Sequence, residues 1–120
     1  MRYNKNIILE ILQSNFEDEI ETFIDCYVMD LEAYELLRLF EHTADYAELG
    51  SINEMHVLDF RVEREEDEEI IDGIFFVQAS IEGYAYWEYE HIYLGSEDAE
   101  FEFHFSFLAR RNQYYSFGMY

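Results

Sequence analysis

The stretch Glu100–Phe107, EFEFHFSF, decides the fold prediction because phenylalanine occupies every second position in it. Successive side chains of a β-strand point to opposite faces of the sheet, so the four phenylalanines share one face. The other face carries Glu100, Glu102, His104 and Ser106. We expect the phenylalanine face to lie in the core, and the role of the polar face becomes the functional question.

The same period of two continues through most of the chain after Gly50. Leu58, Phe60 and Val62 are expected to face the core from a first strand, and the acidic run EEDEE at 65–69 is expected to form a hairpin turn. Further strands are expected at 71–81, around 84–94 and at 99–109, with GSED at 95–98 as a turn. Short connections between consecutive strands favour an antiparallel meander.

Residues before Gly50 have apolar side chains at the three- and four-residue spacing of amphipathic helices. Ser14 and Glu17 have capping-box spacing, which predicts that a second helix begins near Asn15. Asp30 is expected to cap a third helix, and a single bent helix over 16–48 is the alternative. The inward side chains of the third helix are expected to be either Tyr34, Leu37 and Phe40 or Leu36, Leu39 and Phe40.

These patterns predict an α+β fold in which two or three N-terminal helices pack on one face of a four-stranded antiparallel β-meander. The length of 120 residues is that of one ordinary domain. We expect a single domain over 1–120, with a helical part at 1–49, an antiparallel sheet at 50–111 and an aromatic C-terminal tail at 112–120. The tail is expected to dock on the chain's own sheet or on a second copy in a homodimer.

The charge of the chain is strongly negative. The 28 Asp and Glu residues against seven Lys and Arg give a formal net charge of −21 at pH 7. Such a charge repels nucleic-acid phosphates and anionic membranes, so we expect neither as a direct partner. The N-terminus lacks a signal-peptide pattern, the apolar runs are short, and Cys26 is the one cysteine, which together predict a cytoplasmic protein.

No motif in the sequence predicts catalysis or a cofactor. The five glycines are scattered and form no phosphate-binding loop, and Cys26 is expected to be a small buried hydrophobe. His91 and His104, on strands expected to be neighbours, would bind zinc together with a glutamate, but neither they nor His42 and His56 have a metal-motif spacing. We therefore expect no enzyme, no cofactor and no metal ion, with ordinary polar-face histidines.

Three explanations account for the acidity. The acidic side chains solubilise a surface that binds nothing, or they adapt the chain to concentrated salt, or they imitate a nucleic-acid backbone. Abundant Phe, Tyr and Ile and the excess of Glu over Asp disfavour salt adaptation. Glu17, Glu21 and Asp25 are spaced as like-charged helix neighbours, which cost a helix about 0.2–0.5 kcal/mol per pair and so favour a binding role.

In charge and size the chain resembles the DNA-mimic inhibitors that phages and mobile elements make against restriction and CRISPR systems. It is similarly like the acidic immunity proteins that neutralise basic nuclease toxins. This resemblance implies an inhibitor of a nucleic-acid-handling protein, and it assigns no role to any residue. The alternative is a non-inhibitory interaction or ligand-binding module that uses the aromatic stretch GYAYWEYEHIY at 83–93.

The predicted partner-binding surface is the polar face of EFEFHFSF together with its acidic and aromatic neighbours. Strands about 4.8 Å apart, with same-face side chains about every 6.8 Å, make such a face a two-dimensional array of negative charge. We expect a basic nucleic-acid-binding protein to occupy it. The surface consists of Glu65, Glu66, Asp67, Glu68, Glu69, Trp87, Glu88, Tyr89, Glu90, Glu100 and Glu102.

Overall fold

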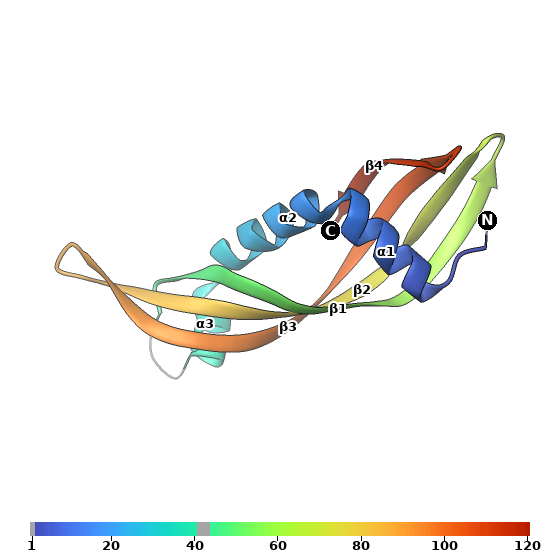
Figure 1. Cartoon of the computed structure of the whole chain (residues 1–120). Helices are drawn as coiled ribbons and strands as arrows, with labels where there is room; N and C mark the ends of the chain where they lie inside the picture. Colours follow the sequence, from blue (N-terminus) through green and yellow to red (C-terminus); the bar gives the residue numbers. More distant parts are fainter. Residues whose placement is uncertain (1, 41–43) are drawn as a thin grey trace. The chain divides into compact units, whose positions relative to one another are not determined.

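The structure, a computed structural model, describes residues 2–40 and 44–120. Within these residues three helices come first and four strands follow in one sheet of order β1-β2-β3-β4 (Figure 1). This arrangement confirms the predicted α+β class and the four-stranded antiparallel sheet. No helix among the described residues has the length and apolar content that a membrane crossing requires. The elements are α1 (Lys5–Asn15), α2 (Glu17–Met29), α3 (Ala33–Leu39), β1 (Tyr46–Glu65), β2 (Glu68–Trp87), β3 (Glu90–Arg110) and β4 (Gln113–Met119).

The chain forms two compact units, and β1, β2 and β3 each contribute residues to both. Unit 1 consists of Met1–Ile20, Glu54–Val77 and Phe101–Tyr120. Unit 2 consists of Glu21–Asn53 and Gln78–Glu100. Each unit has its own set of buried apolar side chains.

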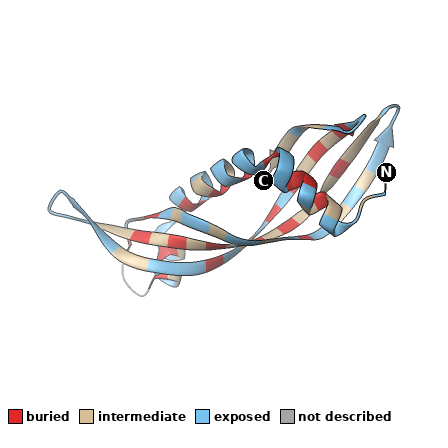
Figure 2. Ribbon diagram, viewed as in Figure 1, coloured by how far each residue is buried: buried red, intermediate tan, exposed pale blue. Residues whose placement is uncertain are grey.

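The core of unit 1 is built around phenylalanines. Phe75 of β2 and Phe105 and Phe107 of β3 are fully buried, as the alternation in EFEFHFSF predicts, and buried segments recur along these strands (Figure 2). Phe16 lies between α1 and α2. Its ring centroid is 5.6 Å from that of Phe107 and 4.8 Å from that of Phe117 on β4. Because each buried aromatic removes about 150–250 Å² from water, these rings hold the helices of unit 1 against its strands.

Local capping explains where α1 and α2 begin. The side chain of Asn4 accepts a hydrogen bond from the N–H of Ile7 at 2.8 Å and so caps the first turn of α1. Phe16 is the C-cap of α1, and α2 starts one residue later, close to the predicted start near Asn15. Three acids, Glu17, Asp18 and Glu19, occupy the first turn of α2, where the helix dipole favours negative charge.

The third helix differs from the prediction at its start. Its N-cap is Glu32 rather than Asp30, because α2 ends at Met29 and α3 begins at Ala33. A single bent helix over 16–48 is therefore wrong. Of the two inward faces that the sequence left open, the second is correct, since the buried or half-buried side chains are Leu36, Leu39 and Phe40, and Tyr34 and Leu37 are exposed.

The core of unit 2 uses small side chains on the sheet. The buried positions of its strands are Ala47, Ala79, Ile81, Gly83 and Ala99, and the helices contribute Ile24, Val28 and Leu36. Phe40 lies directly over Gly83, where a Cβ atom would come within 2.7 Å of the ring. Glycine at this position lets the Phe40 ring reach the backbone of β2. The buried face of this part of the sheet is thus the face on which Phe40 lies.

Strand boundaries in the second half of the sheet differ from the prediction. β2 runs on to Trp87 and β3 begins at Glu90, so residues 84–94 are a strand end, a turn and a strand start rather than one strand. The sequence GSED at 95–98 is not a turn, because β3 continues through it. Gly95 has φ +117°, which residues with a side chain rarely adopt, so glycine there bends the strand without ending it.

The side chains of β3 change face near Gly95. His91 and Tyr93 contact tyrosine rings on the exposed face of the sheet, whereas Ala99 and Phe103 are buried. Odd positions therefore point outward before Gly95 and inward after it, as an irregularity in the strand allows. This reversal lets one strand serve an exposed aromatic surface in unit 2 and a buried phenylalanine core in unit 1.

A similar irregularity in β1 overturns one predicted core position. Val57 is buried and Leu58 is exposed, whereas Phe60 is half-buried on the predicted side. The Asp59 side chain accepts a hydrogen bond from the N–H of Phe60 at 2.9 Å. Such side-chain competition for a backbone donor disturbs the alternation, and the sequence pattern does not reveal it.

Two further predictions concern the tail and the cysteine. The tail forms β4, which pairs antiparallel with β3 and places Phe105 opposite Met119 and Arg110 opposite Gln113. It therefore docks on the chain's own sheet. Cys26 is exposed, so its predicted role as a buried hydrophobe is wrong. Its neighbours Ile24 and Val28 take the buried positions of α2.

Candidate functional site

The structure divides the predicted surface between two hairpin turns in different units. In unit 1, Glu65 ends β1, Glu66 and Asp67 form the turn, and Glu68 and Glu69 begin β2. In unit 2, Trp87 ends β2, Glu88 and Tyr89 form the turn, and Glu90 begins β3. Glu100 belongs to unit 2 and Glu102 to unit 1, and both are exposed.

In unit 1 the acids of the EEDEE hairpin are engaged by the chain itself. The Tyr115 hydroxyl donates to Glu68, and the Tyr3 hydroxyl donates to Glu69 Oε1 at 3.0 Å. Glu69 Oε2 is 3.3 Å from Arg64 Nε, close enough for charge attraction, although this oxygen accepts no hydrogen bond from the described residues. Arg110 is 3.8 Å from Asp67. Three of the five acids therefore have partners within the unit.

These contacts raise the pKa of both tyrosines, Tyr3 and Tyr115. Partial burial and then the hydrogen bond to Glu69 raise the pKa of Tyr3 to about 12. For Tyr115 the hydrogen bond to Glu68 is the largest cause, and partial burial adds to it, so its pKa also rises. In both cases a neighbouring carboxylate accepts from the neutral phenol and would repel the phenolate. The proton on each phenol thus helps to fix the hairpin.

In unit 2 an array of aromatic rings lies on the exposed face of three strands. We call Tyr46, Tyr84, Tyr86, His91 and Tyr93 the tyrosine array. Tyr46 stacks on Tyr84 with centroids 5.1 Å apart and contacts Tyr86 at 5.2 Å. Tyr86 meets His91 edge to face at 4.7 Å, and Tyr84 meets Tyr93 at 5.5 Å. The Tyr46 hydroxyl and His91 Nδ1 are 2.5 Å apart, a hydrogen bond from β1 to β3.

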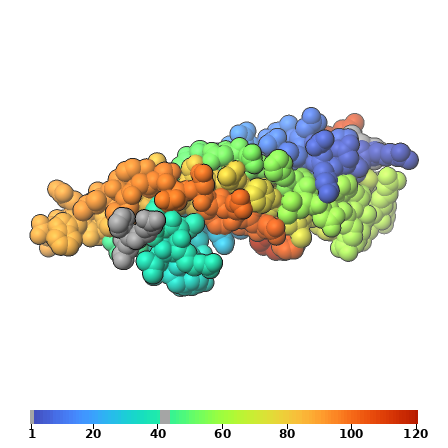
Figure 3. All heavy atoms as spheres, turned by 90° about the horizontal axis from the view of Figure 1, so that it is seen from below, coloured from blue at the N-terminus to red at the C-terminus, as the bar shows by residue number. Residues whose placement is uncertain are grey.

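The tyrosine array lies in a negative field. Partial burial, then the charge of Glu48, raise the pKa of Tyr46, and partial burial followed by Glu82 and Glu48 raise that of Tyr84. The turn beside the array carries Glu88, Tyr89 and Glu90, all exposed, and in Figure 3 its atoms, yellow-orange at the left, lie at the surface. The array therefore presents aromatic rings and carboxylates side by side.

Sequence reasoning found only part of the array. The aromatic stretch at 83–93 is visible in the sequence and includes four of its members. Tyr46 could not be identified, because the residues before Gly50 were expected to be helical and β1 in fact begins at Tyr46. A hydrogen bond also links the residue before β1 to β2, since the Asp45 carboxylate accepts from the backbone N–H of Tyr86 at 2.6 Å.

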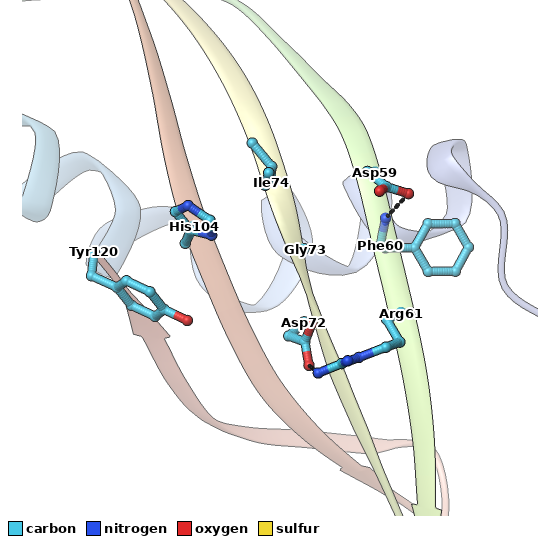
Figure 4. A pocket seen from close by; sticks show the side chains of 8 residues that line it. All are labelled: Asp59, Phe60, Arg61, Asp72, Gly73, Ile74, His104 and Tyr120. Atoms are coloured by element: carbon cyan, nitrogen blue, oxygen red, sulfur yellow. Dashed lines mark hydrogen bonds and ion pairs between the residues drawn. The ribbon is translucent and has the colours of Figure 1, made fainter.

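Unit 1 carries a shallow groove on the polar face of its strands (Figure 4). The volume is about 340 Å³. His104 and Tyr120 form one wall, with their rings stacked at 5.3 Å and almost parallel. Arg61 reaches from β1 toward Asp72 on β2, with Nη2 3.4 Å from the carboxylate. Asp59, Phe60, Gly73 and Ile74 complete the lining.

The histidines form no metal site in the part of the chain that the structure describes, where no group of three or more His, Cys, Asp or Glu side chains is arranged to hold an ion. His91 and His104 are both on β3, so the expectation that they lie on neighbouring strands is wrong. His56 stacks on Phe76 and lies 3.6 Å from Glu54. His42 lies outside the described residues.

The charges of the two units differ. Counted from the sequence, unit 1 has 14 acids and six bases, a formal charge of −8, and unit 2 has 14 acids and one base, Arg38, a formal charge of −13. Among the described residues the ion pairs all lie in unit 1, and no acidic side chain is buried. Comparison of the chain with family models, with curated proteins and with solved structures gave no match.

Proposed function

We propose that this protein is a cytoplasmic inhibitor that occupies the basic nucleic-acid-binding groove of another protein. One observation carries the proposal: unit 2 has a formal charge of −13, its described carboxylates are on the surface, and its single base is Arg38. Such a charge concentrates field on one part of the chain, where a basic groove is attracted and nucleic acid is repelled.

The geometry of a sheet suits this role. Carboxylates on one face of adjacent strands lie about 4.8 Å apart between strands and about 6.8 Å apart along a strand, and DNA likewise presents closely spaced charge, about one per 3.4 Å of axis on each strand. The proposed contacts in unit 2 are Glu88, Glu90 and Glu100 with the aromatic side chains of Trp87 and Tyr89, at the β2–β3 turn and along β3. Glu48 on β1 and Glu82 on β2 extend the carboxylates to the adjacent strands. Aromatic residues add the contact area that interface hot spots use.

The acids of unit 1 have a smaller part in the proposal. Asp67, Glu68 and Glu69 are held by Arg110, Tyr115, Tyr3 and Arg64, so a partner would have to compete with these contacts. Glu65, Glu66 and Glu102 are exposed and remain open to a basic partner. Both an inhibitor of a defence nuclease and an immunity protein against a nuclease toxin fit this description, because the two share the same basic target surface.

The test is to capture a partner at low salt and then to measure its binding to DNA or RNA. The expected partner is a basic nucleic-acid-binding protein whose affinity for nucleic acid falls when this chain is added. Raising the ionic strength from about 0.05 M to about 0.3 M should weaken the complex at least tenfold, since screening shortens the range of the attraction. A captured protein that still binds its nucleic acid equally well would contradict the proposal.

Charge reversal locates the contact. Glu100→Lys with Glu102→Lys should weaken the complex, whereas Glu17→Lys, Glu21→Lys and Asp25→Lys on α2 form the control. The strand positions are exposed, so the fold should survive. Loss of binding only in the helix variant would move the contact to α2.

The groove of unit 1 favours a second candidate, a non-inhibitory ligand-binding module. Its aromatic wall, His104 and Tyr120, and the Arg61–Asp72 pair give it both stacking and polar groups. Ligand sites typically combine such groups in a concavity. Under this candidate the acidic surface only solubilises the chain, and no basic protein would be captured at low salt.

A further inference from the structure

We propose that the tyrosine array of unit 2 is a docking surface for arginine side chains of the basic partner. This inference rests on the proposed function and names the chemistry that the partner must present. Rings of the array are exposed, and this exposure, more than the negative charge of unit 2, supports the inference. Tyr86 is 57% exposed and Tyr93 53% exposed, although both are large side chains that contact other rings of the array.

The array is built to hold its rings in place. Tyr46 links the three strands, because its ring contacts Tyr84 and Tyr86 on β2 and its hydroxyl bonds to His91 on β3. Ring contacts at 4.7–5.5 Å restrict the rotamers of neighbouring side chains. A partner that binds here therefore meets rings that are already ordered, which reduces the entropy lost on binding.

The charge around the rings favours a cation. Glu48 on β1 and Glu82 on β2 lie two residues along the strand from Tyr46 and Tyr84, respectively, so they share the sheet face of these rings. After partial burial, their charges raise the pKa of the two phenols. The single base in unit 2 is Arg38 on α3, and the described ring contacts of the array include no Lys or Arg. A cation over a tyrosine face is attracted by the ring, and a nearby carboxylate adds to that attraction.

Guanidinium fits this surface better than ammonium. Its planar group stacks on an aromatic face and can pair with a carboxylate at its edge, and it is less strongly hydrated than a lysine ammonium. Nucleobases would also stack on exposed tyrosines, but their phosphates would face a formal charge of −13. A second copy of this chain carries the same charge and is disfavoured for the same reason.

The first arm of the test uses the unmodified full chain. Calorimetry measures its affinity for an oligoarginine peptide and for an oligolysine peptide of equal length, at about 0.15 M ionic strength. The arginine peptide should bind about two- to fivefold more tightly for each ring contact that it makes. The ring signals of Tyr86 and Tyr93 in NMR spectra should shift more with arginine than with lysine.

The second arm uses variants. Tyr86→Leu with Tyr93→Leu removes two exposed rings and keeps apolar side chains on the strands. Tyr34→Leu is the matched control, because Tyr34 is 62% exposed in the same unit but lies on α3. The double variant should lose more affinity for the arginine peptide than for the lysine peptide and so lose the preference for arginine, and the control should keep both the affinities and the preference.

The outcomes separate the inference from the proposed function. Equal, salt-sensitive binding of both peptides by the unmodified chain, or an unchanged preference in the double variant, would overturn the arginine surface and leave the basic-partner proposal standing. Binding of neither peptide would contradict both. A dimer that the double variant converts to a monomer would assign the array to a second copy and overturn the inference. If the double variant fails to fold, the ring shifts of the unmodified chain decide.

Discussion

Unit 1 and unit 2 share three strands but use their aromatic residues in opposite ways. In unit 1, Phe75, Phe105 and Phe107 are buried, and Arg61, Arg64 and Arg110 form ion pairs with acids of the same unit. In unit 2 the sheet buries alanines and Ile81, while tyrosines occupy the exposed face among carboxylates with one base in the unit. The difference indicates that the sheet places phenylalanines in the core of unit 1 and tyrosines on a surface of unit 2.

The largest effect should come from a core ring of unit 1. Phe107→Ala removes a fully buried side chain that contacts Phe16 and Tyr114, and it should lower the free energy of unfolding by about 3–5 kcal/mol. Tyr86→Ala in unit 2 should cost less than about 1 kcal/mol because its ring is already exposed. Urea denaturation measures both. Equal losses of unfolding free energy would show that the Tyr86 ring stabilises the fold as much as the buried Phe107 ring does.

Charge reversal at the two turns should have the next largest effect. Glu88→Lys with Glu90→Lys should weaken association with a basic partner at least tenfold, about 1.4 kcal/mol. Glu65→Lys with Glu66→Lys, in the turn whose neighbouring acids are already engaged, should weaken it by less than about threefold. Titration calorimetry compares them. A larger loss from the unit 1 pair would place the contact at the EEDEE hairpin.

Turn substitutions should have a moderate effect on stability. Glu88 and Tyr89 have φ 47° and 71°, and Arg111 and Asn112 have φ 51° and 63°, values that favour Asn-Gly. Glu88→Asn with Tyr89→Gly, and separately Arg111→Asn with Asn112→Gly, should each stabilise the chain by about 1 kcal/mol. Only the first pair should also weaken partner binding. If both leave binding unchanged, the unit 2 turn does not contact the partner.

The smallest effect should appear in alkaline solution. The raised pKa of Tyr3 means that the folded chain holds the phenol proton more tightly than the unfolded chain, whose pKa is near 10. The resulting stability is complete below pH 10 and is lost as the pH rises toward 12. Tyr3→Phe should therefore be slightly less stable at pH 8, and its deficit should shrink above pH 10. Thermal midpoints across this range test it, and a constant deficit would contradict the assignment.

The sequence predicted those parts of the fold in which one physical signal dominates. Alternation in β2 and in EFEFHFSF identified the buried face correctly, because burial of large apolar side chains leaves little choice of register. The three- and four-residue spacing from Leu36 to Leu39 and Phe40 was also visible. What it could not resolve was which of two plausible faces α3 buries, since that depends on the neighbouring strands.

Of the two predicted turns, EEDEE at 65–69 was correct and GSED at 95–98 was wrong, for a local reason. Gly95 and its polar neighbours have turn composition, yet β3 continues through them with one unusual φ. Glu88-Tyr89 is the true turn and has neither Gly nor Asn to mark it. The site was likewise only partly predictable. The aromatic stretch and the acids are visible in the sequence, but the engagement of Glu68 and Glu69 by Tyr115 and Tyr3 depends on contacts more than forty residues apart.

The short length of β4 has a consequence for self-association. β4 pairs with β3 from Phe105 to Arg110, so in unit 2 β3 is an edge strand with backbone donors and acceptors on its outer side. Open edges invite pairing between copies, and charged side chains along an edge prevent it. Glu90, Glu97, Asp98 and Glu100 lie along this stretch. Near the isoelectric point of about 4.2 that protection weakens, so precipitation by edge pairing should begin in unit 2.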